Sequence, residues 1–374
     1  MAFITVQIVE MSYAPTISLV MSVYNAGRFL RPAMESVLAQ TFGDVEYVVI
    51  DDGSSDESPK VLREYAERDA RIRLTVRGNK GLTATLNEAL GQARGEFIAR
   101  MDCDDISKPD RFEKQLAAMR ADPSLVCVGG HFELIDEKGR LLTRLRPPGD
   151  DAAIQKLLLA GHTAICHPAA MIRREALSRV GNYDPYFKTT QDLDLWLRLG
   201  EVGRLGNIPE VVLQFRQHGG SVSETKREEQ RRFGREAVER AWKRRGITDG
   251  TFEAEEPWRP GRDRASRHAF ALRYGWWGFN SGARNTALAY GMKAVGIAPW
   301  KVAGWKLLAS ALVKPMPAAD AAFSSDTPSP LPSPGGRGGT GAGCSTGVEM
   351  PGPYLPLPPG EGRGEGVRGS EVRR

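Results

Sequence analysis

Residues 97–105 read Phe97-Ile98-Ala99-Arg100-Met101-Asp102-Cys103-Asp104-Asp105, a largely apolar run that stops in three carboxylates. A short run of this kind is typical of a strand buried on both faces, and ligands of such sheets gather beyond the carboxyl ends of the strands. Because neighbouring like charges repel one another, a hard cation such as Mg²⁺ or Mn²⁺, shared with phosphate oxygens, is the natural compensation. The stretch therefore predicts a strand of an α/β sheet with a metal-diphosphate site at its end.

Other uses of these aspartates explain less of the pattern. A turn that caps the next helix accounts for Asp105, because Ser107 and Pro109 suit a helix start, but it leaves Asp102 unexplained. An EF-hand loop is excluded, because Ile106 and the serine after it stand where a ligand and the turn glycine belong. A phosphatase nucleophile usually follows the first strand of its domain, whereas at least three strand-like runs precede this one.

Strand-like and helical segments alternate along the first part of the chain. Strands are predicted at 16–24, 45–50, 72–77 and 97–102, and helices at 27–40, 54–69, 82–94 and 108–121. Ser54 and Glu57 have the spacing of a capping box, and Gly95 is the expected left-handed end of the third helix. This alternation predicts an α/β fold with a doubly wound sheet.

The turn after the first strand excludes one common class of doubly wound protein. Dinucleotide-binding folds place a glycine-rich turn there, whereas residues 22–27 read SVYNAG, with a single glycine. A nicotinamide dehydrogenase is therefore not expected. Further strands at 125–135, 141–145, 169–172 and 211–215 and helices at 150–160 and 191–199 follow the acidic motif, and we expect them to cover the sugar and the acceptor.

The length of the chain suits one large or two ordinary domains, and its cysteine content suits a reducing cytoplasm. The 374 residues carry a formal net charge of +5, and residues 216–245 alone hold ten Lys/Arg against five Asp/Glu, so the basicity is local. The four cysteines show no Cys-x-x-Cys spacing, which argues against a zinc site or a disulfide framework. Residues 1–10 lack the basic start of a signal peptide, and Met11 is an alternative start. No run approaches ~20 apolar residues, so no membrane-spanning helix is predicted.

Five short motifs occur in order over about residues 15–220. They are Ser22-Val23-Tyr24-Asn25, Asp51-Asp52-Gly53-Ser54-Ser55-Asp56, Asn79-Lys80-Gly81-Leu82 with Asn87, Gly95-Glu96-Phe97-Ile98 leading into Asp102-Cys103-Asp104-Asp105, and Gln191-Asp192-Leu193-Asp194-Leu195-Trp196. Each motif alone is weak, but the set resembles the family 2, inverting nucleotide-sugar glycosyltransferases. The resemblance implies the GT-A fold, a doubly wound mixed sheet with a nucleotide-binding half and an acceptor-binding half.

The resemblance also implies roles for the matched residues. In that family, the carboxylate after the second strand contacts the nucleobase, the first Asp of the acidic motif approaches the ribose, and a later one holds the metal, which gives these roles to Asp51, Asp102 and Asp104. An acidic residue of a Glu-Asp-type motif is the catalytic base, which assigns Asp192, although Gln191 departs from the commoner Glu. The resemblance adds these donor-site residues: Tyr24, Asn25, Asn79 and Lys80.

Three assignments have structural alternatives that the sequence leaves open. Asp51 lies at an Asp-Gly turn at a strand end. Thr189 stands three positions before Asp192, which is the spacing of a helical capping box. His218 lies just beyond an apolar strand, where some GT-A enzymes use a histidine as an additional metal or diphosphate contact, but a lone histidine is more often structural.

The implied reaction is a single displacement at the anomeric carbon. Mg²⁺ or Mn²⁺ at Asp104 would stabilise the leaving diphosphate, and Asp192 would take the acceptor proton from the opposite face, which inverts the configuration. The expected partners are a nucleotide-diphosphate sugar and a saccharide or lipid-linked acceptor, with no nucleic acid, and the expected product is a cell-envelope or extracellular polysaccharide or glycolipid. Two alternatives remain. A nucleotidyltransferase usually has a Gly- and Arg/Lys-rich phosphate loop, which is missing here, and a non-catalytic nucleotide-sugar binding module would not need Asp192.

The chain is expected to divide into four parts. They are an N-terminal extension (1–14), the GT-A domain (15–225), a basic and aromatic helical region (226–316) and a disordered tail (317–374). The tail is predicted to be disordered because nine Pro and thirteen Gly occur within residues 321–374. Trp residues and cations interleave within 274–314, which suits helices at an anionic membrane surface and equally suits helices packed on the catalytic domain. The predicted location is the cytoplasm, with contact at the inner face of the membrane as an open alternative.

Overall fold

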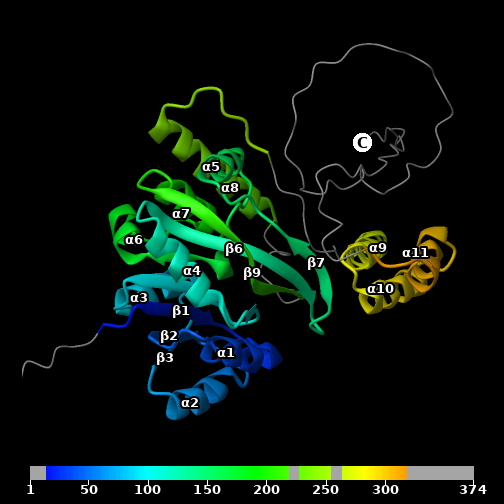
Figure 1. Ribbon diagram of the computed structural model, residues 1–374, viewed down its shortest axis with the longest axis horizontal. Coiled ribbons are helices and arrows are strands. Elements are labelled where there is room, and N and C mark those ends of the chain that lie inside the picture. The colour runs from blue at the N-terminus through cyan, green and yellow to red at the C-terminus, as the bar shows by residue number, and fades with distance from the viewer. Residues whose placement is uncertain (1–13, 219–226, 254–262, 318–374) are drawn as a thin grey trace, which may run out of the picture.

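The computed structural model describes residues 14–218, 227–253 and 263–317. Its centre is a nine-stranded sheet in the order β3-β2-β1-β4-β8-β6-β9-β5, with β7 paired to β6. Figure 1 shows helices around this sheet, with α9, α10 and α11 beside the β7 end. The predicted doubly wound α/β sheet is confirmed, whereas the predicted N-terminal extension and disordered tail lie almost entirely outside the described residues.

The elements follow one another along the chain as β-α units and then as a longer mixed region. The strands are β1 (Ile17–Val23), β2 (Val45–Asp52), β3 (Ile72–Arg77), β4 (Phe97–Asp102), β5 (Ile106–Ser107), β6 (Leu125–Asp136), β7 (Leu141–Leu145), β8 (Met171–Arg173) and β9 (Arg204–Gln217). The helices are α1 (Leu30–Leu38), α2 (Ser58–Arg68), α3 (Leu82–Gln92), α4 (Arg111–Ala121), α5 (Asp151–Ala160), α6 (Arg174–Val180), α7 (Gln191–Leu199), α8 (Arg227–Arg245), α9 (Arg264–Asn280), α10 (Arg284–Ile297) and α11 (Val302–Val313), with short 3₁₀ turns η1 (Gly27–Phe29) and η2 (His167–Ala169).

The first half of the sheet consists of four parallel strands. β1 lies between β2 and β4, so Ser22 pairs with Ile50 on one side and with Asp102 on the other. β3 continues the parallel pairing beyond β2. Because these strands all point the same way, the loops that follow them leave the sheet at one edge, which is the edge where ligands of doubly wound sheets bind.

The second half of the sheet is mixed and depends on one long strand. β9 has 14 residues and runs parallel to β6 along the whole length of β6. The sequence predicted only 211–215 of it, because Pro209 interrupts the strand pattern. The ladder passes from the pair Gly130–Ile208 to the pair His131–Val211, so Pro209 stands in a bulge where its missing N–H costs no ladder bond.

Both faces of the sheet are covered by helices. One face packs against α1, α2 and α4 through side chains such as Leu30 and Phe112. The other face packs against α3, α5, α6, α7 and α8 through side chains such as Leu86 and Trp196. The strongly charged α8 belongs to this second layer because it buries an apolar stripe that includes Phe233.

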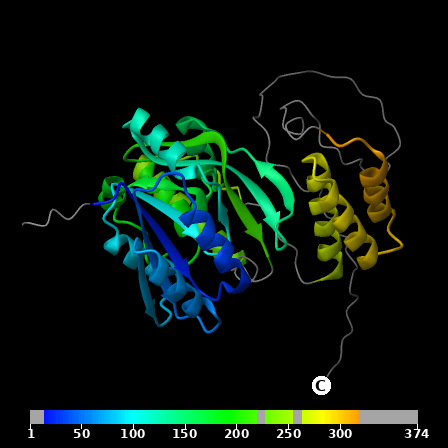
Figure 2. The same cartoon turned by 60° about the horizontal axis from the view of Figure 1, so that its bottom comes forward.

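Helices α9, α10 and α11 pack on the end of the β6–β7 hairpin. The hydroxyl of Tyr290 on α10 donates to Asp136 Oδ2 at the end of β6 (3.2 Å), and the Ser281 and Thr143 hydroxyls are 3.4 Å apart. Figure 2 shows this three-helix bundle to one side of the layers that cover the sheet. Among the described residues, no helix combines the length and the apolar composition that crossing a bilayer requires.

Two local predictions were wrong, and both failed because of contacts between distant residues. α3 ends in an extended Ala93, and Gly95 is not left-handed. Gly95 lies instead against β1, where a Cβ atom would be 2.5 Å from the Ser18 nitrogen. The capping box at Ser54 does not form, because its hydroxyl accepts a hydrogen bond from the backbone N–H of Asn25 (2.9 Å). β5 and α6 were not predicted.

Replacing Gly95 by alanine should destabilise the protein by at least about 2 kcal/mol, because the new methyl group meets the backbone of the central strand β1 rather than a movable side chain. The matched control is Gly91→Ala in the exposed last turn of α3, where a Cβ atom meets nothing within 4 Å. That change should stabilise the protein by roughly 0.5–1 kcal/mol. Denaturant unfolding of both variants tests the pair, and equal effects would contradict the assigned contact.

Candidate active site

The acidic motif lies at the carboxyl end of β4, where the sequence predicted it. Asp102, Asp104 and Asp105 each present a carboxylate oxygen within 4.8 Å of the other two. Burial raises the pKa of Asp102, while the charge of Arg100 opposes that increase. The negative charges of Asp104 and Asp192 raise the pKa further. Asp192 is 90 residues farther along the chain, so the fold brings the predicted base to the predicted diphosphate site.

Arg100 is a buried cation beneath this motif, and the sequence analysis did not assign it a role. Side chains alternate along a strand, so Arg100 and Asp102 lie on the same side of β4, and the Arg100 guanidinium contacts Asp102 Oδ1 at 2.5 Å. Its Nε and one terminal nitrogen are buried without a hydrogen-bond partner among the described residues. Burial raises the pKa of Asp192, and the charge of Arg100 opposes that increase. The available signal was a single charge inside an apolar strand, two residues before an aspartate.

Arg216 on β9 fixes the loop that carries the motif. Its backbone N–H donates to Asp105 Oδ1 (2.8 Å), and its Nε donates to the Asp104 carbonyl (2.8 Å). Its guanidinium also donates to the Asp136 carbonyl (3.2 Å) and lies over the ring of Phe29. Asp105 is buried, and burial together with the neighbouring aspartates raises its pKa well above its usual range. Asp105 therefore anchors the loop to β9.

His218 follows directly after β9 and contacts Asp104. The imidazole Nε2 lies 2.7 Å from Asp104 Oδ2, and the ring lies 4.7 Å from the ring of Phe29, measured between centroids. The structure therefore brings together the two residues that the sequence proposed as metal ligands. Their oxygen and nitrogen donors suit a divalent ion.

Asp51 and Asp52 end β2, and the structure separates their functions. Asp52 accepts the backbone N–H groups of Lys80 (2.8 Å) and Gly81 (2.9 Å) and forms an ion pair with Arg77, so its oxygens are occupied. Asp51 Oδ2 accepts only a weak bond from a backbone N–H of the following turn at 3.3 Å. Its Oδ1 is buried and has no partner among the described residues. Asp51 therefore offers an unused acceptor, as a ligand-binding carboxylate would.

The other predicted donor-site residues lie at the same edge but differ in availability. Tyr24 follows β1 and is 55% exposed. Asn25 Oδ1 accepts from the Ser55 N–H (2.8 Å), which ties the β1 loop to the β2 loop. Asn79 Nδ2 donates to the backbone of Asp52, and the Lys80 ammonium pairs with a glutamate on α3 (3.0 Å). In this structure Asn25, Asn79 and Lys80 therefore support the loops of the site.

Asp192 lies in the first turn of α7 with its carboxylate half-buried. The capping-box alternative fails, because α7 is preceded by Thr190 without a capping bond and the Thr189 hydroxyl is buried without a partner among the described residues. Burial raises the pKa of Asp192. Asp194, two residues on, is held by Arg198 at 2.6 Å. Of these two aspartates, Asp192 is the one available for chemistry.

Helix α3 holds the loop that leads to Asp192. The Asn87 side chain donates to the Tyr183 carbonyl (2.8 Å) and accepts from the Tyr183 N–H (3.1 Å), and the Thr83 hydroxyl donates to the Phe187 carbonyl (2.9 Å). Thr190 has a φ of 63°, a left-handed conformation that a β-branched residue rarely adopts and that costs of order 1–3 kcal/mol. Its hydroxyl bonds to a backbone carbonyl of α8 at 3.3 Å. The backbone before Asp192 is therefore clamped from two sides.

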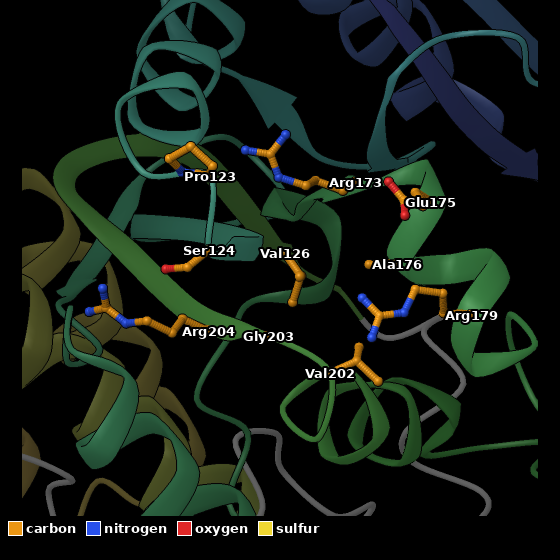
Figure 3. Close-up of a pocket in the computed structure, with 10 residues that line it drawn as sticks. All are labelled: Pro123, Ser124, Val126, Arg173, Glu175, Ala176, Arg179, Val202, Gly203 and Arg204. Atoms are coloured by element: carbon orange, nitrogen blue, oxygen red, sulfur yellow. The ribbon is translucent and has the colours of Figure 1, made fainter.

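A depression of about 250 Å³ lies away from these residues, where β6 and β9 begin (Figure 3). Three arginines line it, but two are already bound within the protein. Arg173 donates to the Leu125 carbonyl (2.8 Å), and Arg204 pairs with Asp122 (2.8 Å). It contains none of the predicted site residues and lies at the opposite edge of the sheet from Asp102.

Comparisons with known proteins agree with the geometry. The model of glycosyl transferase family 2 matches residues 18–181. EpsE of Bacillus subtilis, a protein named as a glycosyltransferase, is 34% identical over 212 residues, which cover 55% of this chain and 75% of EpsE. The O-antigen biosynthesis glycosyltransferase WbnJ of Escherichia coli is 32% identical over 213 residues, which cover 56% of this chain and 82% of WbnJ. Residues 1–349 of S. aureus TarS, solved with UDP-GlcNAc, superpose with a TM-score of 0.50 at 16% identity, covering 80% of this chain and 88% of that one, which bears on the fold alone.

The different bonding of Asp51 and Asp52 predicts different effects on stability. Asp52→Asn should lower the free energy of unfolding by about 2–3 kcal/mol, because it removes one buried acceptor oxygen and the Asp52–Arg77 ion pair, which leaves Arg77 paired with Glu88 alone. Asp51→Asn should change it by less than about 1 kcal/mol, because Asp51 Oδ1 has no bond to lose. Thermal unfolding of both variants measures the difference. Equal losses would mean that both carboxylates are structural.

Proposed function

The chain belongs to glycosyltransferase family 2, and we propose that it transfers a sugar from a nucleotide-diphosphate sugar to a hydroxyl group of a saccharide or lipid-linked acceptor, with inversion at the anomeric carbon. The observation that carries the proposal is the half-buried Asp192 carboxylate, close enough to Asp102 for its charge to raise the Asp102 pKa. No cation pairs with Asp192 in the part of the chain that the structure describes. A base beside a diphosphate site suits a single displacement.

The nucleoside would bind across the ends of β1, β2 and β4. The unused Oδ1 of Asp51 is a buried acceptor that a nucleobase N–H would satisfy. The exposed ring of Tyr24 begins the neighbouring loop and could pack against the base. Asp102 faces the same edge and would accept a ribose hydroxyl, while Arg100 holds its carboxylate from below. In these roles, Asp51 and Asp102 would contribute to the affinity for the nucleotide-sugar donor and would take no part in the chemical step.

A divalent cation fits the part of the acidic motif nearest His218. Asp104 Oδ2 and His218 Nε2 are 2.7 Å apart, close to the spacing of two adjacent ligands about 2.1 Å from one octahedral ion. Mg²⁺ or Mn²⁺ suits a set in which carboxylate and phosphate oxygens predominate. The ion would stabilise the negative charge that the leaving diphosphate gathers. Arg216 and Asp105 would keep the Asp104 backbone in register for this role.

Asp192 would act as the general base. Its carboxylate would accept the proton of the acceptor hydroxyl while the oxygen attacks the anomeric carbon from the face opposite the diphosphate. Burial raises the pKa of Asp192, which makes it a stronger base than an exposed aspartate. The clamped loop and α7 would hold the Asp192 carboxylate in a fixed orientation toward the acceptor hydroxyl, which proton transfer requires. A single displacement needs no covalent sugar-enzyme intermediate.

The names of the relatives support the product class that we propose, and the alternative functions differ in what they require. WbnJ is named for O-antigen biosynthesis, which supports a polysaccharide or glycolipid product here. A non-catalytic nucleotide-sugar binding module would retain the donor site without needing an available Asp192. A nucleotidyltransferase would need a phosphate loop after β1, where residues 24–27 read YNAG.

Removing divalent cations, or making Asp104→Asn, should abolish transfer and weaken nucleotide-diphosphate binding, because both remove the counter-charge of the diphosphate. Mn²⁺ binding, followed by calorimetry, should be lost in the variant while its melting temperature stays unchanged. The matched control is Asp110→Asn, whose side chain is 43% exposed and pairs with Lys114 on the surface. It should bind Mn²⁺ like the parent. Full activity in excess chelator would exclude a catalytic metal.

Asp192→Asn should lower kcat by ~10²- to 10⁴-fold with donor affinity retained, because the amide keeps the shape of the side chain but cannot accept the proton. Asp194→Asn is the matched control within α7. It breaks the 2.6 Å pair with Arg198, so it should lower the unfolding free energy by roughly 3 kcal/mol. Parent-like turnover in Asp192→Asn would show that Asp192 is not the general base and serves only the start of α7, and loss of donor binding would place Asp192 in the nucleotide site.

The raised pKa of Asp192 also predicts a pH dependence. A general base acts only when it is deprotonated, so kcat/KM should fall on the acid side, below a pKa higher than the ordinary 3.8 of an aspartate. The residual rate of Asp192→Asn should lack this acid limb over the range in which the variant stays folded. An unchanged limb in the variant would assign the titration to another group.

A further inference from the structure

The exposed large apolar side chains of the described residues concentrate on α10, α11 and the connection between them. Six of the nine such side chains lie there: Met292 (61% exposed), Trp300 (66%), Val302 (77%), Trp305 (53%), Leu312 (67%) and Val313 (83%). The other three, Tyr24, Val76 and Tyr186, are scattered over the catalytic half. We call the first six residues, together with the exposed lysines among them, the α10–α11 surface.

One face of α11 explains why these residues are exposed. Gly304, Leu307, Ser310 and Ala311 are buried against the bundle, at helical spacing. The opposite face carries Val302, Trp305, Ala309, Leu312 and Val313 at i, i+3, i+7, i+10 and i+11, all of them exposed. A helix in water normally turns its apolar side inward. The outward side of α11 is at least as apolar as its packed side, so this side indicates a second binding surface.

The charge of the bundle identifies the kind of surface that fits. Residues 264–317 contain eight Lys/Arg and no Asp/Glu, although the whole chain carries only +5. Lys293 on α10, Lys306 on α11, and Lys301 and Lys314 at the two ends of α11 are all exposed. Exposed tryptophans beside lysines are typical of segments that lie in the headgroup layer of an anionic bilayer. The 12 residues of α11 can lie in such a layer, and the described helices do not span one.

We propose that the α10–α11 surface docks the protein on the face of an anionic lipid bilayer. A second copy of the chain fits less well, because a symmetric contact through this surface would bring two bundles without a single carboxylate against each other. The proposal concerns where the protein acts and holds whichever sugar is transferred. The proposal is compatible with the packing of these helices on the catalytic domain, since Tyr274 and Tyr290 pack inward while Trp300 and Trp305 face outward.

A short chain of hydrogen bonds connects the helical bundle that carries the α10–α11 surface to the acidic motif. Arg216 donates to the carbonyls of Asp104 and Asp136, and the Asp136 carboxylate accepts the hydroxyl of Tyr290 on α10. Three residues therefore connect the acidic motif to the bundle without a flexible linker. An acceptor carried by a lipid in the bound membrane would lie on the side of the molecule where this connection ends.

The test is flotation of the full chain with phosphatidylcholine vesicles that contain about one quarter phosphatidylglycerol, against pure phosphatidylcholine vesicles. The protein should bind the anionic vesicles, and added salt should weaken the binding. Lys301→Glu/Lys306→Glu should weaken partitioning by at least about 25-fold, on the basis of about fivefold for each lysine. The matched control Lys60→Glu/Lys156→Glu changes two exposed lysines of α2 and α5 by the same charge and should bind like the parent.

A second pair of variants tests the apolar side of the surface. Leu312→Ser/Val313→Ser should reduce vesicle binding by at least about tenfold, because two exposed side chains lose their lipid contact. Val76→Ser, 41% exposed on β3, should not reduce it. All variants should keep the parent melting temperature and the parent rate of donor hydrolysis in solution, which separates this test from that of the reaction. Equal binding to both vesicle types, no binding, or a dimer that disappears in Leu312→Ser/Val313→Ser would overturn the proposal.

Discussion

The repulsion among three carboxylates in one loop is the constraint on which the rest of the site depends. Asp102, Asp104 and Asp105 lie within 4.8 Å of one another, so each would lose its charge or move apart without compensation. The protein supplies compensation from two directions: Arg100 from the strand below and Arg216 from β9. Asp105 anchors the loop to β9, so Asp102 and Asp104 are the two carboxylates that remain at the carboxyl-terminal edge of the sheet.

The alternation of strands and helices was predictable because it depends on local patterns. The carboxyl ends of β1, β2 and β4, and the aspartates that follow them, could therefore be placed at one edge from the sequence alone. The role of Arg216 could not, because it depends on the parallel pairing of β9 with β6, and the bulge at Pro209 hides most of β9 from pattern analysis. The prediction of a left-handed Gly95 was wrong for the same reason, which is a contact between distant residues. Gly95 lies against Ser18 on β1, 77 residues earlier in the chain.

Partners of individual polar atoms were the least predictable part of the site. Asp51 and Asp52 are adjacent and chemically identical, yet one is saturated by the β3–α3 loop and the other keeps a free oxygen. Asn79 and Lys80 are predicted to contact the donor, and in this structure they also support the loop through Asp52 and a glutamate of α3. Sequence motifs record which residues occur together, and they do not distinguish residues that bind a ligand from residues that hold the binding loop.

The two halves of the site are joined through rigid elements rather than through loops alone. α3 follows the donor-side loop and clamps Tyr183 and Phe187 ahead of α7, so a shift of α3 would move Asp192 together with the donor side. On the other side, β9 connects the acidic motif to the bundle. This strand supplies Arg216 and leads directly into His218, which contacts Asp104. It also pairs with β6, and the end of β6 contacts the α9–α11 bundle through Asp136. The position of that bundle relative to Asp104 is therefore fixed by a strand pair. A protein built in this way can keep a constant distance between a bound surface and its reacting groups, which suits an acceptor presented at a surface and would be unnecessary for one that diffuses freely.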